Sequence, residues 1–89
     1  MRLYTLEEQC NISGPRIKEA RKRAKMSQDI LAAKLQLQGL QMGQMAISRI
    51  ETGKRVVLDF ELPIFADVLG VTIEWLLGIE KQNSDISKK

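Results

Sequence analysis

The sequence predicts an all-α domain built from five short helices. Apolar residues recur at spacings of three and four along most of the 89-residue chain, as in amphipathic helices. Glycines and helix-capping residues divide this pattern into short segments. No useful stretch alternates between apolar and polar residues as a half-buried strand would. A chain of this length forms one small domain with a thin core, in which each large apolar side chain matters.

The first helix is predicted to begin at Gly14-Pro15. Proline is well tolerated in a first helical turn, where its missing N–H has no helical partner. Ile17, Ala20 and Ala24 follow at helical spacing and form a narrow apolar stripe. Most of the other positions of this helix are basic.

The second helix is predicted to start after Ser27, a residue type that favours the N-cap. Asp29 would stabilise the positive end of the helix dipole. Leu31, Ala32 and Leu35 form the apolar stripe that we expect to be buried.

The third helix is predicted between Gly43 at its N-cap and Gly53, which is typical of a left-handed helix end. Ile47 and Ile50 lie on one face and are expected to be buried. The side chains that point away from this face are Gln44, Met45, Ser48 and Arg49.

The fourth helix is predicted to be capped by Asp59, which places Pro63 within its first turn, and to end at Gly70. Its inward-facing residues are Leu62, Phe65, Ala66 and Leu69. Thr72 caps a short fifth helix, IEWLL, which ends at Gly78.

We expect three parts along the chain: an N-terminal arm at 1–13, the helical domain at 14–78 and a polar tail at 79–89. The arm contains apolar residues that can pack on the domain or on a partner. No signal peptide is visible, and no apolar run approaches the roughly 18–20 residues of a membrane span. We therefore expect a cytoplasmic protein with no membrane association.

The net charge of +3 is unevenly distributed. Residues 15–55 hold ten basic and three acidic side chains, for a net +7, whereas 1–14 carry −1 and 56–89 carry −3. This asymmetry suits a protein that presents one side to a polyanion. A solvated, charged helix surface is the alternative interpretation.

The residue types that are missing exclude several kinds of chemistry. Cys10 is the only cysteine and there is no histidine. An internal disulfide is impossible, and the usual ligands of a zinc site are lacking. A Cys–His or Ser–His nucleophile pair is excluded for want of the histidine base. We expect no metal, no cofactor and no enzymatic activity.

The polar face of the third helix has the side chains that read base edges in the major groove of B-DNA. A glutamine such as Gln44 can pair with adenine, and the guanidinium of Arg49 can pair with guanine. Met45 can contact a thymine methyl, and Ser48 can bond to several bases. Lys54 and Arg55 follow the helix and are expected to hold phosphates, which fix register without reading sequence.

Three stretches carry a family resemblance: RIKEARKRAKMSQDILAAKL, ISRIETGKR and FADVLGVTIEWLLG. Together they resemble the Cro/repressor-type helix-turn-helix family, also called the XRE family, over about residues 15–78. The resemblance implies a five-helix, lambda-repressor-like domain in which helices two and three form the DNA-binding unit. It implies a DNA-backbone contact for Gln28 and a partly buried ion pair between Arg21 and Glu51, which removes Arg21 from the DNA-contacting residues.

The connection between helices two and three departs from the family pattern. Leu35 and Ile47 are further apart than is usual, and the extra residues lie in QLQGLQMG. Either helix two continues for roughly one more turn, or the segment is a true loop. Leu37, Leu40 and Met42 indicate that it packs onto the domain. Its backbone amides are also candidates for a phosphate contact.

These observations predict sequence-specific binding of double-stranded DNA, and we expect a transcriptional repressor acting as a homodimer. Trp75 and Leu76 are interpreted either as core residues or as part of a dimer interface. Two alternatives remain: a protein-interaction module of the same fold, or the antitoxin of a toxin–antitoxin pair.

Overall fold

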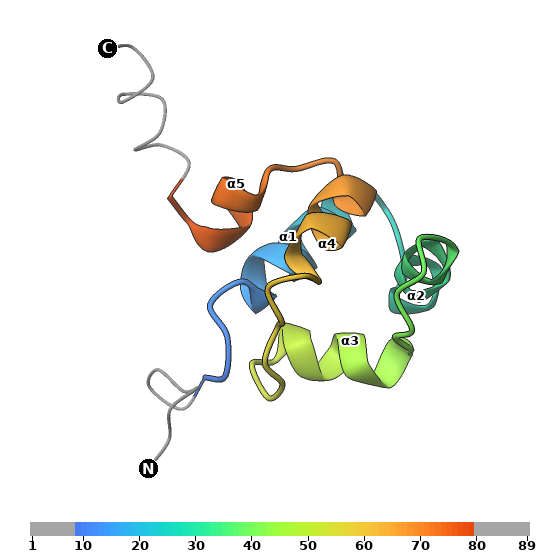
Figure 1. Cartoon of the computed structure of the whole chain (residues 1–89), viewed down its shortest axis with the longest axis horizontal. Helices are drawn as coiled ribbons and strands as arrows, with labels where there is room; N and C mark the ends of the chain where they lie inside the picture. The colour runs from blue at the N-terminus through green and yellow to red at the C-terminus, as the bar shows by residue number, and fades with distance from the viewer. Residues whose placement is uncertain (1–8, 80–89) are drawn as a thin grey trace.

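The structure is a computed structural model that describes residues 9–79. Within this range the chain forms five α-helices and no β-strand, so the all-α fold class is confirmed. The helices are α1 (Gly14–Arg23), α2 (Gln28–Leu37), α3 (Gln44–Glu51), α4 (Leu62–Leu69) and α5 (Ile73–Leu77) (Figure 1). The expected arm at 1–8 and the expected tail at 80–89 lie outside the described residues.

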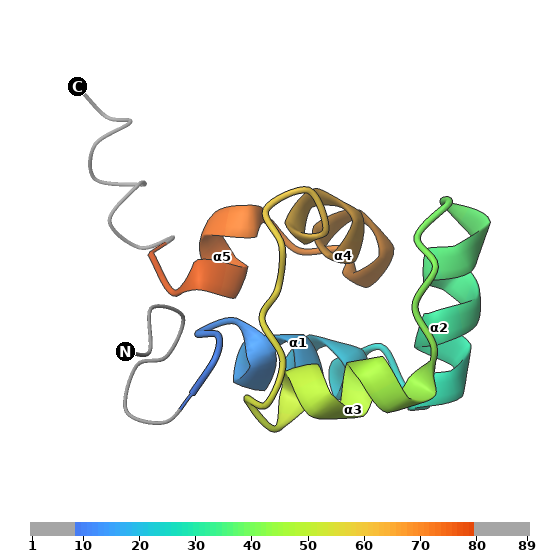
Figure 2. The same ribbon diagram turned by 60° about the horizontal axis from the view of Figure 1, so that its bottom comes forward.

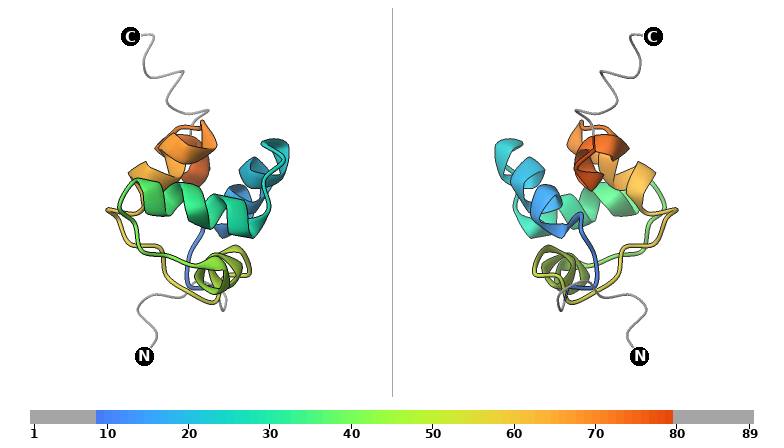
Figure 3. Two further views of the ribbon diagram at one scale, coloured as in Figure 1. Left: turned by 90° about the vertical axis from the view of Figure 1, so that its right-hand side faces the viewer. Right: turned by 90° about the vertical axis from the view of Figure 1, so that its left-hand side faces the viewer.

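Helix α3 lies along one edge of the domain, where it packs against α1 and α2. Helices α4 and α5 lie on the far side of the domain from α3 (Figure 3). All five helices contribute side chains to one core, which consists of Ile17, Ala20, Leu31, Ala32, Leu35, Leu40, Met42, Ile47, Ile50, Phe65, Ala66, Leu69 and Leu76. Ile47 and Ile50 are fully buried, and burial of each contributes about 1.5–3 kcal/mol. These two residues fix which face of α3 remains exposed.

Most helix ends follow the predicted capping chemistry, including the ends of α4 at Gly70 and of α5 at Gly78. The Ser27 hydroxyl accepts a hydrogen bond from the backbone N–H of Ile30 at 3.0 Å. The Thr72 hydroxyl accepts in the same way from Trp75 at 3.0 Å. Gly53 has φ +80° just after α3, where a side chain would be strained. The predicted caps of α2 and α5 and the predicted end of α3 are confirmed.

The apolar stripe of α1 is shorter than predicted. Ala24 is exposed, because α1 ends at Arg23 and Ala24 already forms its C-cap. Met26, in the following turn, is half-buried and packs against the core instead. The stripe of α1 that is buried therefore consists of Ile17 and Ala20.

The predicted cap of α4 at Asp59 is wrong. The helix begins at Leu62, its N-cap is Glu61, and Asp59 lies in an exposed turn. The Glu61 carboxylate does not cap the helix but turns back and accepts the backbone N–H of Leu58 at 2.9 Å. This bond closes the turn and delays the start of the helix. Pro63 still falls in the first turn, as expected.

The connection between α2 and α3 is a true loop at 38–43. Leu40 and Met42 are buried as predicted, but Leu37 is 86% exposed. Leu37 is two residues from the buried Leu35, which is about 200° around a helix, so it faces away from the core. The Gln36 amide donates to the Met42 carbonyl at 3.0 Å, and the loop runs back along α2 before α3 begins (Figure 2).

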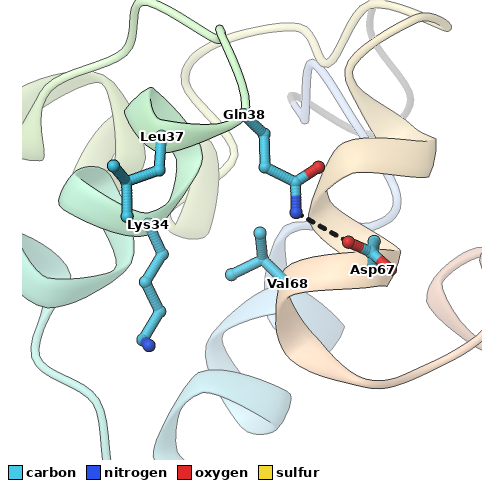
Figure 4. A pocket seen from close by; sticks show the side chains of 5 residues that line it. All are labelled: Lys34, Leu37, Gln38, Asp67 and Val68. Carbon is cyan, nitrogen blue, oxygen red and sulfur yellow. Dashed lines mark hydrogen bonds between the residues drawn. The ribbon is translucent and has the colours of Figure 1, made fainter.

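A second contact ties the start of this loop to α4. The Gln38 amide donates to the Asp67 carboxylate at 2.6 Å beside a surface hollow of about 250 Å³ (Figure 4). The hollow is lined by Lys34, Leu37, Gln38, Asp67 and Val68. The loop is therefore fixed at its start to α4 and at its end to α2.

Candidate nucleic-acid interface

The outer face of α3 presents the predicted polar set to solvent. Gln44 and Arg49 are exposed, Met45 is 72% exposed, and Ser48 is half-buried. Met45 therefore does not pack on the α2–α3 loop. Four different side-chain chemistries are thus displayed on two turns of one helix whose opposite face is seated in the core.

Two cationic side chains at the C-terminal end of α3, those of Arg49 and Lys54, make few contacts within residues 9–79. The Arg49 guanidinium makes one long contact, at 3.4 Å, with the carbonyl of Lys54. A bond of that length is weak and leaves most of the guanidinium donors available. Lys54 is exposed just beyond the helix. Both cations can therefore reach an external partner.

Arg21 and Glu51 form a buried ion pair between α1 and α3. The guanidinium donates to both carboxylate oxygens, at 2.7 and 3.0 Å, and also to the carbonyl of Met26 at 2.8 Å. The hydrogen bond with Glu51 raises the pKa of Arg21 above its ordinary value, although burial opposes this. The side chains are only 10% and 2% exposed, so Arg21 is not available to DNA.

Gln28 joins the N-terminal ends of α2 and α3. Its amide donates to Glu51 at 3.0 Å, and its carbonyl oxygen accepts from the Gln44 amide at 2.5 Å. The first residue of α2 therefore lies beside the first residue of α3, as the two adjoining helix ends in Figure 2 indicate. Gln28 is half-buried, and it connects the Arg21–Glu51 ion pair to Gln44 on the outer face of α3.

The side chain of Arg55 takes part in a second ion pair, which was not predicted. Its guanidinium donates to the Glu61 carboxylate at 3.1 and 3.3 Å and to the carbonyl of Val56 at 2.9 Å. The Glu61 side chain is only 4% exposed. An acid six residues away in a loop is a weak sequence signal, since loop geometry decides whether the two groups meet. We therefore leave Arg55 out of the proposed phosphate contacts, and Lys54 remains.

Residues 9–13 fix the C-terminal end of α3, another feature that sequence reasoning missed. The Asn11 amide donates to the carbonyls of Ile50 and Arg55 at 3.1 and 2.7 Å, and its oxygen accepts from Gly14 N–H at 2.7 Å. Cys10 N–H donates to the Gly53 carbonyl at 2.8 Å. This end of the expected arm is thus part of the domain.

The predicted dimer residues on α5 differ in their exposure. Leu76 is fully buried in the core, so of the two interpretations offered for it the core residue is the one that the structure supports. Trp75 is half-buried, with the guanidinium groups of Arg16 and Arg23 at 4.8 and 5.3 Å from its ring centre. Arg16 also donates to the Trp75 carbonyl at 3.1 Å. The ring thus anchors α5 to α1 and keeps part of its surface accessible.

Residues 9–79 contain neither a metal-binding cluster nor a helix that could span a membrane. No group of three or more His, Cys, Asp or Glu side chains in this range is arranged to hold a metal ion. None of the helices described here has both the length and the apolar character needed to cross a bilayer.

Two helices that meet at their N-terminal ends, the second with an exposed polar face, define a helix-turn-helix DNA-binding domain. The comparison with family models agrees, because a family described as Helix-turn-helix matches residues 17–76. The chain belongs to this XRE-type helix-turn-helix family, and it is a DNA-binding transcription regulator. A search of curated proteins finds no match.

Proposed function

We propose that the protein represses transcription by binding a specific double-stranded DNA sequence as a homodimer, with α3 in the major groove. The observation that carries this proposal is the exposed face of α3 opposite Ile47 and Ile50, which are 0% exposed. The major groove admits one α-helix. A helix that reads it needs a firmly seated inner face and an outer face of hydrogen-bonding side chains.

Each outward side chain of α3 has a base-edge partner that suits its chemistry. The amide of Gln44 matches the donor and acceptor of adenine, and the guanidinium of Arg49 matches the two acceptors of guanine. Met45 suits the methyl group of thymine, and Ser48 can donate or accept. Arg49 is the strongest candidate, because its guanidinium is exposed and has only one weak contact within the protein.

Phosphate contacts are proposed for Lys54 and for Gln28, one on each side of the base-reading face. Residues 15–55 carry a net +7, of which the buried pair Arg21–Glu51 contributes nothing. The remaining excess of positive charge attracts a polyanion without reading its sequence. The sugar–phosphate contacts then fix the orientation of α3.

A homodimer is proposed because two copies read more base pairs than one, and repression is proposed because it requires only that the site be occupied. One α3 reads only a few base pairs, whereas two symmetry-related copies would read two half-sites about 34–36 Å apart. The accessible part of Trp75 on α5 is the proposed contact between copies. Repression needs no activity beyond occupying the site, which suits a domain of this size.

Selection of bound duplexes from a random pool, followed by mobility-shift titration, tests this proposal. We expect a preferred sequence with two-fold symmetry. We also expect the logarithm of the binding constant to fall with the logarithm of salt concentration, by about 0.9 for each phosphate contacted. Retention on heparin with no preferred duplex would favour a protein-interaction module instead. A toxin that co-purifies with the protein would favour an antitoxin.

A further inference from the structure

The side-chain amide of Asn11 connects three segments of the backbone. Its NH₂ group donates to the carbonyls of Ile50 and Arg55, at 3.1 and 2.7 Å. Its oxygen accepts the backbone N–H of Gly14 at 2.7 Å. Ile50 lies in the last turn of α3, Gly14 is the first residue of α1, and Arg55 lies beyond the end of α3. The donors of this amide are therefore used within the protein.

A glycine allows the residues before Asn11 to lie against the end of α3. Gly53 has φ +80°, and a Cβ added to it would meet the side chain of Gln9. The Gly53 carbonyl accepts the backbone N–H of Cys10 at 2.8 Å. We call residues 9–11 the clasp, because they hold the chain where it leaves α3. The clasp precedes α1 in Figure 1.

The clasp holds the backbone on both sides of Lys54. The carbonyl before it, that of Gly53, and the carbonyl after it, that of Arg55, both accept hydrogen bonds from the clasp. The Lys54 N–H itself donates to the Arg49 carbonyl of α3 at 2.7 Å. Lys54 is nevertheless an exposed residue. It therefore combines a fixed backbone with an accessible cation.

A backbone that is ordered before binding favours the contact of its side chain with a phosphate. Ordering the backbone of one residue on binding lowers the binding constant by about five- to thirtyfold. The bonds to the clasp remove this loss at Lys54, because its backbone is already fixed in the free protein. Arg55 does not take its place, since its guanidinium is paired with the buried Glu61 at 3.1 Å.

We infer that Asn11 is a positioning residue for DNA binding: its amide holds the turn after α3 so that the Lys54 ammonium meets a phosphate at a fixed place. This inference rests on the proposed function, since Lys54 is proposed there as a phosphate contact. It differs from a purely structural role for Asn11, which would lower the stability of the domain and leave the number of phosphates contacted unchanged.

Asn11→Ser separates the two long-range bonds of Asn11 from its local one. A serine hydroxyl can still accept a nearby backbone N–H, as serine commonly does in turns. It is one bond shorter and has a single hydrogen, so it cannot donate to both the Ile50 and the Arg55 carbonyls. The substitution changes no charge. Gln36→Met is the matched control, because it removes an amide bond to a backbone carbonyl, that of Met42, before α3 rather than after it.

The salt dependence of binding to the selected duplex is measured by mobility shift for the wild type and both variants. We expect Asn11→Ser to reduce the log–log slope by about one unit, as the loss of one phosphate contact does. Binding should weaken on the order of fivefold, equally on duplexes of different sequence. Gln36→Met should keep the wild-type slope. A lower melting temperature of Asn11→Ser with an unchanged slope would mean a purely structural role and would overturn the inference.

Lys54→Ala identifies the phosphate contact on which Asn11 acts. By itself it should reduce the slope by about one unit. Combined with Asn11→Ser it should reduce the slope no further, because the same contact has already been lost. Additive changes in the double variant would mean that the two residues act independently, and this result would also overturn the inference.

Failure of the proposed function gives a different result. If the wild type binds no duplex at low salt, the proposed function fails and the inference fails with it. If the wild type binds and Asn11→Ser keeps its slope, only the inference fails.

The order of the backbone at Lys54 is measured in the free protein by nuclear magnetic resonance relaxation. Its amide should have an order parameter of about 0.85 in the wild type, as in a rigid helix, and a lower one in Asn11→Ser. If Asn11→Ser does not fold, as judged by circular dichroism, the wild-type value decides. A value below about 0.6, typical of a flexible segment, would refute a fixed Lys54.

Discussion

The two ends of α3 are held in different ways. At the C-terminal end, backbone groups are fixed by neighbouring segments: Asn11 bonds to the Ile50 carbonyl, and Cys10 bonds to the Gly53 carbonyl. Gly14 approaches the same carbonyl of Ile50 so closely that an added Cβ would clash with it. The buried carboxylate of Glu51 belongs to this end as well.

The N-terminal end of α3 is held by side chains. Gly43 has no side chain to cap the helix, and a Cβ added there would meet no atom within 4 Å. The link across to α2 is the exposed hydrogen bond between Gln44 and Gln28. An exposed bond between neutral side chains contributes only about 0.5–1.5 kcal/mol.

This difference separates stability from recognition along one short helix. Changes at the C-terminal end remove backbone contacts or strand a buried charge, so they should reduce the free energy of unfolding. Changes at the N-terminal and outer positions remove little that the fold needs, so they should alter DNA binding first. Substitutions at these outer positions can then change which DNA sequence is bound without unfolding the domain.

The largest effect is expected from Arg21→Met, which leaves Glu51 buried without its partner. Breaking a buried ion pair in this way costs about 3–5 kcal/mol. We expect the free energy of unfolding, measured by urea denaturation, to fall by that amount. The Gln28 amide is too weak a donor to replace the guanidinium.

Arg23→Met is the matched control on the same helix. Arg23 pairs with Glu19 at 2.6 Å, but both side chains are about half exposed or more. Exposed pairs of this kind contribute about 0–1 kcal/mol, and the contact of Arg23 with the Trp75 ring adds about 0.5–1 kcal/mol, so the loss should stay below that of Arg21→Met. Similar losses for Arg21→Met and Arg23→Met would show that burial of the Arg21–Glu51 pair does not matter.

Gly14→Ala is expected to have the next largest effect. The new Cβ would meet the backbone oxygen of Ile50 and the Asn11 oxygen, so α1 and the end of α3 must separate. Overpacking of this kind costs about 1–3 kcal/mol. Gly43→Ala, at the other end of α3, meets no neighbour and should cost only about 0.5–1 kcal/mol, the difference between glycine and alanine at an N-cap. Thermal unfolding of both variants compares the two losses of stability. Equal melting temperatures would contradict the proposed difference between the two ends of α3.

Much of this architecture could be predicted from the residues, because the signals are local. The stripe of Ile47 and Ile50, the caps at Ser27 and Thr72 and the stop at Gly53 each depend on a few neighbouring positions. The five helices and the exposed face of α3 follow from such signals. Helical spacing alone, however, does not show at which residue a helix begins or ends. For this reason the predictions that Ala24 is buried in α1 and that Asp59 caps α4 are wrong.

Contacts between distant segments could not be predicted in the same way. Asn11 bonds across 39 and 44 residues of sequence to the carbonyls of Ile50 and Arg55, and no local pattern marks such an amide. The pairing of Arg55 with Glu61 depends on how the loop between α3 and α4 closes. The exposure of Trp75 and the burial of Leu76 likewise depend on how α5 packs on the other helices.

On the outer face, Arg49→Ala should reduce binding and leave stability nearly unchanged. The guanidinium has one weak internal contact, so its loss should change the free energy of unfolding by less than about 0.5 kcal/mol. Binding to the selected duplex should weaken by about 1–3 kcal/mol, with a relaxed preference at one base pair. Titration of singly substituted duplexes measures this, and an equal loss on all of them would make Arg49 a phosphate contact.

The smallest expected effect is that of Lys54→Ala, which tests whether the end of α3 that is fixed for stability also holds a phosphate. Lys54 is exposed and its charge is not paired in the part of the chain described, whereas the neighbouring Arg55 is tied to the buried Glu61. Lys54→Ala should weaken binding evenly across all duplexes and reduce the steepness of the salt dependence by about one unit. Arg55→Ala should instead lower the melting temperature, because it strands the Glu61 carboxylate. If the two variants changed the salt dependence equally, Arg55 would have to leave Glu61 when DNA binds, and the prediction that Lys54 and not Arg55 holds the phosphate would fail.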